Sequence, residues 1–274
     1  MAVGRYVCPQ CLVPYDPEEE LNGKGVLTRE HVPPRSLGGK RLALTCDSCN
    51  SALGGNLDSH MRLEADLYDF HRGVLAEIEA TLRTTSGSIP IHLSCVDGTM
   101  VAKGVKDATH ADNYVGVEHD FVVGAMGENW QNFQFHVEFN QYSPERAAVG
   151  WLRVAYLAFF AALGYRFVLR KELDVVRAKI RDPLGCELRN FRLSSSEFCS
   201  EPQLLRVEAP DRFRSYLLRY RNHSIFLPRY GDGTLYERLA GYEGGVSETF
   251  RGKVYPWPVG GPAFLHDYHS QPGA

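Results

Sequence analysis

Residues 26–50 read VLTREHVPPRSLGGKRLALTCDSCN. Two short apolar runs, 26–28 and 42–45, flank a loop rich in proline and glycine, and this pattern predicts two short strands joined by a turn. A short helix is expected to begin at Asp47, beside a pair of cysteines. This order of strand, strand and helix is the feature from which the interpretation of the whole chain starts.

The cysteines indicate what would stabilise so small a unit. The chain has seven cysteines, and four of them form two Cys-x-x-Cys pairs, Cys8 with Cys11 and Cys46 with Cys49. Four thiolates can close a tetrahedral Zn²⁺ site with no open position for a substrate. We therefore expect a structural zinc rather than disulfides, because the N-terminus carries no recognisable secretory signal.

The composition is that of a globular protein, with 44% hydrophobic and 23% charged residues among 274. The expected fold class is α+β, in three parts. A zinc-stapled ββα domain is expected over residues 1–70, a helical linker over 71–88, and a larger α+β domain with mostly antiparallel strands over 89–274. Apolar residues at helical spacing predict a helix over 57–82, and alternation predicts strands within 89–105 and 133–139.

The most apolar stretch spans residues 147–165, following a helix start at Ser143-Pro144. Arg153 lies inside it, and a charge at that position disfavours a membrane span. This pattern predicts a buried core helix in the larger domain. A soluble, cytoplasmic protein without membrane contact is expected.

The motifs between and after the cysteines resemble those of the HNH endonucleases, the ββα-metal nucleases, in their four-cysteine branch. The resemblance covers about residues 5–62 and depends on Glu30-His31, Pro33-Pro34, Gly38-Gly39 and Cys46-Asp47-Ser48-Cys49-Asn50 in that order. It implies hydrolysis of DNA phosphodiester bonds, with His31 as general base and Mg²⁺, for which Mn²⁺ can substitute, on Glu30 and Asn50. The four cysteines would hold the structural zinc.

The residue types are suited to this chemistry. Magnesium prefers hard oxygen ligands and keeps several waters, as a carboxylate and an amide oxygen would allow. An imidazole with a pKa of about 6.5 can accept a proton from water near neutral pH. Two positions depart from the family pattern, since Glu30 replaces the commoner Asp and Arg41 replaces an Asn before the second strand. Asp58 and His60 either add metal contacts or are solvated residues of the following helix.

A nucleic-acid partner must be bound by a local patch, because the net charge is −3. Arg29, Arg35, Lys40 and Arg41 are the candidates near the predicted site. The arginine-rich segments 143–182 and 203–229 either follow a phosphate backbone or form charged outer faces. Double-stranded DNA is the expected substrate, with restriction or anti-phage defence as the setting and a homodimer or a defence-system protein as a partner. The alternative is an inactive zinc-stabilised nucleic-acid-binding protein or adaptor.

Overall fold

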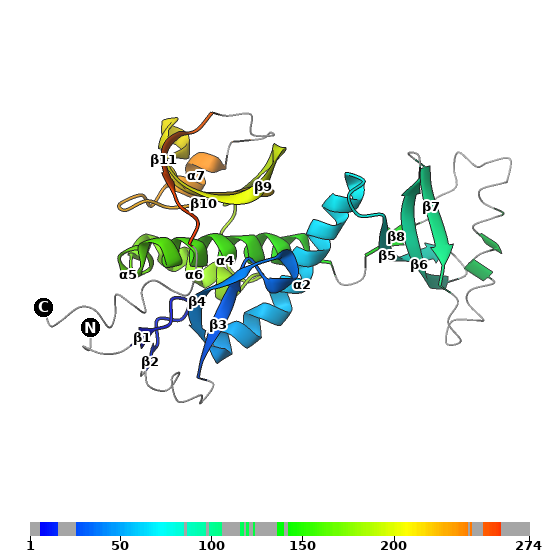
Figure 1. The fold of residues 1–274 in the computed structure, drawn as a ribbon, viewed down its shortest axis with the longest axis horizontal. Helices are drawn as coiled ribbons and strands as arrows, with labels where there is room; N and C mark the ends of the chain where they lie inside the picture. The colour runs from blue at the N-terminus through cyan, green and yellow to red at the C-terminus, as the bar shows by residue number, and fades with distance from the viewer. Residues whose placement is uncertain are drawn as a thin grey trace, which may run out of the picture. The chain divides into compact units, whose positions relative to one another are not determined.

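The computed structural model describes residues 6–15, 26–84, 87–96, 99–105, 116–117, 119–120, 123, 136–139, 142–240, 242 and 249–258. The chain forms two compact units (Figure 1). Unit 1 combines Met1–Met61 with Pro144–Ala274, and unit 2 is Arg62–Ser143. Helix content, strand content and antiparallel pairing in both units confirm the predicted α+β class.

Unit 1 begins with two small antiparallel strand pairs, of which the sequence predicts only the second. Strands β1 (Tyr6–Val7) and β2 (Pro14–Tyr15) form a small antiparallel pair. Strands β3 (Leu27–Val32) and β4 (Lys40–Cys46) form a hairpin whose loop contains the short helix η1 (Arg35–Leu37).

Helix α2 (Asp47–His71) follows β4 directly. Asp47 lies in its first turn, where a carboxylate interacts favourably with the helix dipole. The predicted order of strand, strand and helix is confirmed.

The core of unit 1 is built around α4 (Pro144–Leu163), which is buried along most of its length. An added Cβ at Gly150 would lie 2.3 Å from the sulfur of Met61. Glycine at this position therefore allows α2 and α4 to approach closely. The hairpin, the first half of α2 and α4 share one hydrophobic cluster, so the ββα elements do not have a separate core. Short helices α5 (Tyr165–Val168), η4 (Lys171–Leu173) and α6 (Asp174–Arg181) follow α4.

A three-stranded antiparallel sheet covers α4, with β9 (Arg192–Ala209) between β10 (Ser215–Leu227) and β11 (Arg251–Tyr255). Alternate residues of a strand face opposite sides. Leu218 and Ile225 accordingly join the α4 core, whereas Leu217 and Phe226 join a second cluster with η5 (Asp211–Phe213) and α7 (Leu235–Leu239).

One helix, α4, is long and apolar enough to cross a membrane by length and composition. However, 72% of its most apolar window is buried within the protein. It therefore has the surroundings of a core helix, as the sequence predicts.

Unit 2 contains the end of α2 and a four-stranded antiparallel sheet in the order β7-β6-β5-β8. Its strands are β5 (Glu77–Thr84), β6 (Gly87–Val96), β7 (Thr99–Gly104) and β8 (His136–Glu138). Phe70 from α2 packs with Ile78, Leu82 and Ile91 of the sheet.

Two expectations differ from the structure. The helix predicted over 57–82 ends at His71, and Glu77–Thr84 is strand β5, so the residues described within 71–88 form no helical linker. Ile78 and Leu82 are spaced as on a helix, but with Ala80 they also fit a strand of period two, and all three are buried. Residues 144–240 pack with the ββα elements, whereas the prediction grouped them with 89–143.

Candidate active site and zinc centre

The four paired cysteines form a cluster in unit 1. Cys8 and Cys11 lie in and beside the β1–β2 turn, Cys46 ends β4, and Cys49 lies in the first turn of α2. Their sulfur atoms all lie within 4.8 Å of one another. Among the described residues, this is the one group of three or more Cys, His, Asp or Glu side chains so close together.

The chemistry of the cluster fits zinc. The Cys46 N–H donates to the Cys8 sulfur at 3.4 Å. Hydrogen bonding, above all from the Cys49 thiol, lowers the pKa of Cys8 to about 5 against the opposing effect of burial. A thiolate is therefore favoured at Cys8, and thiolates are the form in which cysteine binds metal.

Residues far along the chain hold the cysteine loop in place. The Tyr156 hydroxyl donates to the carbonyl of Pro9, between the first two cysteines. The Tyr165 hydroxyl bonds to both the N–H and the carbonyl of Val7, at 3.0 and 2.8 Å. The cysteine loop and the α4–α5 segment are thus parts of one packed unit.

Asn50 is oriented by the hairpin. Its amide nitrogen donates to the Thr28 hydroxyl at 2.9 Å, and that hydroxyl donates to the Thr45 carbonyl at 3.4 Å. The amide oxygen Oδ1 therefore points away from this bond. It lies 3.8 Å from the position that a Cβ of Gly54 would take.

Asp58 lies on the same side of α2 as Asn50. Its Oδ2 is also 3.8 Å from the Cβ position of Gly54, so an amide oxygen and a carboxylate oxygen flank a glycine. Burial raises the pKa of Asp58 to about 6, although Arg153 opposes the rise. His60 lies about 200° further around the helix from Asp58 and is buried near Arg146.

Glu30 is buried on β3, on the strand face that also carries Thr28. Its side chain is 4% exposed, and its Oε2 accepts a hydrogen bond from Nη2 of Arg153 at 2.7 Å. Burial raises the pKa of Glu30, while Arg153 acts in the opposite direction. Sequence reasoning did not find this contact, although Arg153 was visible as the single arginine of the apolar stretch 147–165.

His31 has different surroundings from Glu30. The register shifts between these two residues, with Leu42 as the extra residue on β4, and Arg41 is thereby placed opposite His31. Burial, then Arg41 and Arg35, lowers the pKa of His31. The imidazole is partly exposed and is favoured in its neutral form, which a general base requires.

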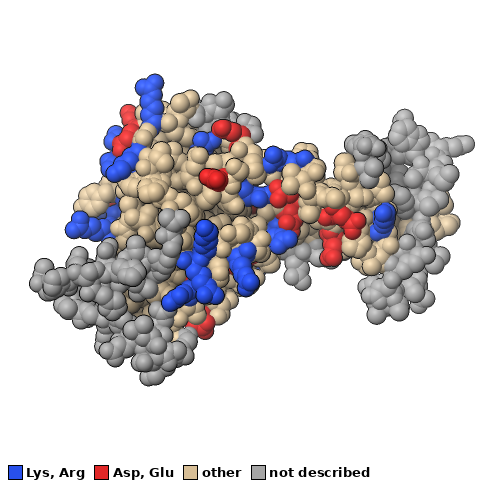
Figure 2. All heavy atoms as spheres, viewed as in Figure 1, with Lys and Arg blue, Asp and Glu red and all other residues tan. Residues whose placement is uncertain are grey.

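The four predicted nucleic-acid contacts, Arg29, Arg35, Lys40 and Arg41, are all exposed. Figure 2 shows Lys and Arg side chains gathered on the face that carries β3 and β4. By contrast, several arginines of the segment 203–229 are paired with acidic residues, including Arg206, Arg219 and Arg229. The β3–β4 hairpin is therefore a better basic surface for a nucleic acid than the segment 203–229.

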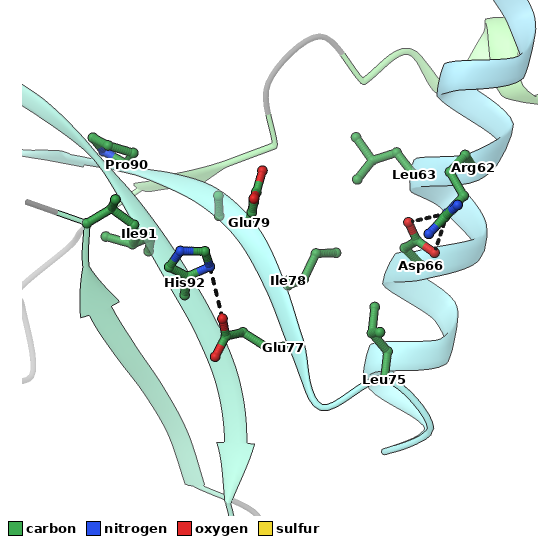
Figure 3. Close-up of a pocket in the computed structure, with 12 residues that line it drawn as sticks. Arg62, Leu63, Asp66, Leu75, Glu77, Ile78, Glu79, Pro90, Ile91 and His92 are labelled. Carbon is green, nitrogen blue, oxygen red and sulfur yellow. Dashed lines mark hydrogen bonds and ion pairs between the residues drawn. The ribbon is translucent and has the colours of Figure 1, made fainter. Parts of the chain in front are cut away.

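Unit 2 has a hollow of about 710 Å³ between the end of α2 and the sheet. Its rim carries the ion pair Arg62–Asp66 and a contact of 3.0 Å between His92 and Glu77 (Figure 3). Glu79 adds a further acidic side chain. This balance of charge disfavours a phosphate group, so the hollow is not a second candidate for nuclease chemistry.

Comparison with known families identifies residues 19–65 as a match to the HNH endonuclease family. The match contains Glu30, His31 and Asn50 but neither Cys8 nor Arg153. It confirms the resemblance inferred from the sequence, and the four-cysteine cluster agrees with the zinc branch. No curated protein and no solved structure matches the chain. The segment that matches the HNH endonuclease family thus folds together with residues outside it.

Proposed function

We propose that the protein is a metal-dependent endonuclease that hydrolyses phosphodiester bonds of double-stranded DNA. The observation that carries this proposal is that the segment matched by the HNH endonuclease family contains Glu30, His31 and Asn50 on a ββα fold. A protein that only bound nucleic acid would not need a buried carboxylate, a neutral imidazole and an oriented amide on the same small scaffold.

Each residue has a distinct role in the proposed reaction. His31, held neutral by burial and by its arginine neighbours, accepts the proton of the attacking water. Glu30 and Asn50 would hold Mg²⁺ or Mn²⁺, which would supply charge stabilisation at the phosphate and the leaving oxygen. Gly54 places no side chain beside Asn50 Oδ1, which lies 3.8 Å from the position that a Cβ would take. Arg35 and Arg41 attract the substrate phosphate.

The zinc proposed at the four cysteines is structural. Four protein ligands fill a tetrahedral site, so no position remains for water or substrate. Its contribution is to fix the β1–β2 turn against β4 and the start of α2. Restriction or anti-phage defence in the cytoplasm is proposed as the setting by analogy alone.

The direct test is incubation with supercoiled plasmid and Mg²⁺, with and without EDTA. We expect nicking or linearisation by the wild type, its loss in EDTA, and its loss in His31→Ala at an unchanged melting temperature. His92→Ala, which removes a histidine of unit 2, is the matched control and should cleave normally. Cleavage by His31→Ala would remove this residue from the mechanism.

The alternative function is a zinc-stabilised nucleic-acid-binding protein without catalysis. The burial of Glu30 against Arg153 favours it, because a metal ligand must be reachable by the metal. Plasmid binding without any cleavage in Mg²⁺ or Mn²⁺ would select this alternative.

A further inference from the structure

Arg153 lies at the candidate site in the structure, although it is distant from the site's motifs along the chain. It lies on α4, 123 residues from Glu30 and outside the segment that matches the HNH endonuclease family. The residue is 3% exposed. Its Nη2 lies 2.7 Å from Oε2 of Glu30, and its Nη1 lies 3.7 Å from Oδ1 of Asp58.

Burial of a charged guanidinium group costs free energy, because the group loses its contacts with water. Arginine stays protonated in proteins, and the desolvation of a charge is offset only by close and well-oriented partners. Arg153 has two carboxylates as partners, and its Nε finds no hydrogen-bond acceptor among the described residues. When both carboxyl groups are ionised, the cluster carries two negative charges against one positive charge, and this excess favours the binding of a further cation.

The arrangement also joins the predicted metal ligands. Asp58 contacts Arg153 through Oδ1, whereas its Oδ2 lies 3.8 Å from the position that a Cβ of Gly54 would take, as does Oδ1 of Asn50. Glu30 uses only Oε2 for the arginine. A chain of contacts thus runs from Glu30 through Arg153 to Asp58, and the second carboxylate oxygen of Asp58 flanks Gly54 together with Oδ1 of Asn50.

We infer that Arg153 is a positioning residue of the metal site: it bridges Glu30 and Asp58 and fixes both carboxylates for a divalent cation bound with Asn50. This inference rests on the proposed function. Ligating carboxylates are commonly held by such outer partners, and loss of a partner costs about 10- to 100-fold in metal affinity or activity. A merely structural ion pair would leave metal affinity unchanged in a folded variant.

The test is Mn²⁺ binding to the zinc-loaded full chain, followed by calorimetry and by electron paramagnetic resonance. Arg153→Met removes the charge and retains an apolar stem of similar length, and Arg153→Lys retains the charge but can reach only one carboxylate. Lys179→Met is the matched control. Lys179 is another buried cation, 2% exposed and paired with Glu145 at 2.6 Å, and it is no part of the site.

We expect Arg153→Met to bind Mn²⁺ about 10- to 100-fold more weakly than the wild type. Arg153→Lys should recover part of the affinity, and Lys179→Met should bind as the wild type does. Unchanged or tighter binding by Arg153→Met would overturn the inference, and tighter binding would identify the arginine as a competitor of the metal. If Arg153→Met fails to fold, Arg153→Lys decides, because a folded lysine variant with wild-type affinity also contradicts the inference.

Plasmid cleavage by the same preparations separates the inference from the function on which it rests. Wild type that binds Mn²⁺ without cleaving DNA would contradict the nuclease proposal and leave the positioning role standing. Wild type that cleaves DNA, together with an Arg153→Met variant that keeps full metal affinity, would contradict the positioning role and leave the nuclease proposal standing. Wild type without Mn²⁺ binding would overturn both.

Discussion

Gly54 separates two oxygen atoms on α2, Oδ1 of Asn50 and Oδ2 of Asp58. Glycine in a helix interior costs about 0.5–1 kcal/mol relative to alanine. A methyl group at this position would make only ordinary contacts at 3.8 Å, so packing does not demand the glycine. The methyl group would partly fill the space next to Oδ1 of Asn50 and Oδ2 of Asp58, which are the proposed metal ligands.

The neighbouring glycine provides a matched comparison. We expect Gly54→Ala and Gly55→Ala each to raise the free energy of unfolding by about 0.5–1 kcal/mol, because both relieve the helix cost of glycine. Only Gly54→Ala should weaken Mn²⁺ binding, since a Cβ at Gly55 meets nothing within 4 Å. Urea denaturation and metal titration of both variants check this. Equal metal affinities in the two would place the ion elsewhere.

Some residues of the candidate site can be identified from the sequence alone, and others cannot. Asn50, His31 and the cysteines stand within short motifs, so their types and order identify them as candidates. Arg153 could not be assigned in the same way, because its contact with Glu30 is made by packing of α4 against the hairpin. The placement of Arg41 opposite His31 was equally hidden, since it depends on one extra residue in β4.

At the scale of elements, the four-cysteine cluster joins a turn, a strand end and a helix start. The two β1–β2 strands have two residues each and cannot be stable alone. Metal binding and folding are therefore expected to be coupled. The tyrosine bonds from α4 and α5 depend on the same loop.

Purified protein should contain about one tightly bound zinc per chain, measured by elemental analysis. Removal of zinc with a strong chelator should lower the melting temperature, because the β1–β2 turn loses its ligand bonds. Cys49→Ser should show the same loss, whereas Cys95→Ser in β6 should not. A metal-free chain with the wild-type melting temperature would contradict the zinc assignment.

Helix α7 offers a pH-dependent test in the C-terminal sheet region. Asp232 accepts hydrogen bonds from Arg238 at 2.8 and 2.7 Å and from the Thr234 N–H at the start of α7. The Arg238 bonds lower the pKa of Asp232 below its ordinary value. A carboxyl group with a lowered pKa in the folded state stabilises the fold above its unfolded pKa of about 3.9, and this stability is lost as the pH falls through the folded value.

Asp232→Asn should therefore destabilise the protein by about 1.5–3 kcal/mol at pH 7, the usual range for hydrogen bonds to charged groups. The difference from the wild type should shrink below about pH 3.9. Urea denaturation at several pH values measures it. Asp211→Asn is the control, because that carboxylate is 91% exposed and lies 3.8 Å from Arg214. A difference for Asp232→Asn that persists in acid would exclude the charge as its cause.

Sequence patterns predict some of the helices and strands and fail to predict others. Hydrophobic spacing found β3, β4, α4 and the start of α2, because the motifs around them fix where each begins. It failed at 77–84, where apolar residues satisfy both a helical and a strand pattern and pairing with β6 and β8 decides. The joint packing of the ββα elements with α4 was not predictable, since it depends on contacts between distant segments.

The two units differ sharply in charge. Residues 62–143 contain five Lys and Arg against twelve Asp and Glu, whereas the rest of the chain contains 25 against 21. A net charge near −7 repels phosphate, so unit 2 is a poor DNA-binding surface. Unit 1, with a net charge near +4 and the basic hairpin, is the better one.

DNA binding should therefore depend on unit 1 alone. Each phosphate contact contributes about one unit to the slope of log affinity against log salt. Arg35→Gln with Lys40→Gln should weaken binding of a duplex, measured without divalent metal, and reduce that slope by about two. The control is Arg83→Gln in β5, whose partner is Glu138 at 3.0 Å, and it should change neither quantity. A slope unaffected by the hairpin variant but reduced by Arg83→Gln would move the DNA-binding surface to unit 2, against its charge.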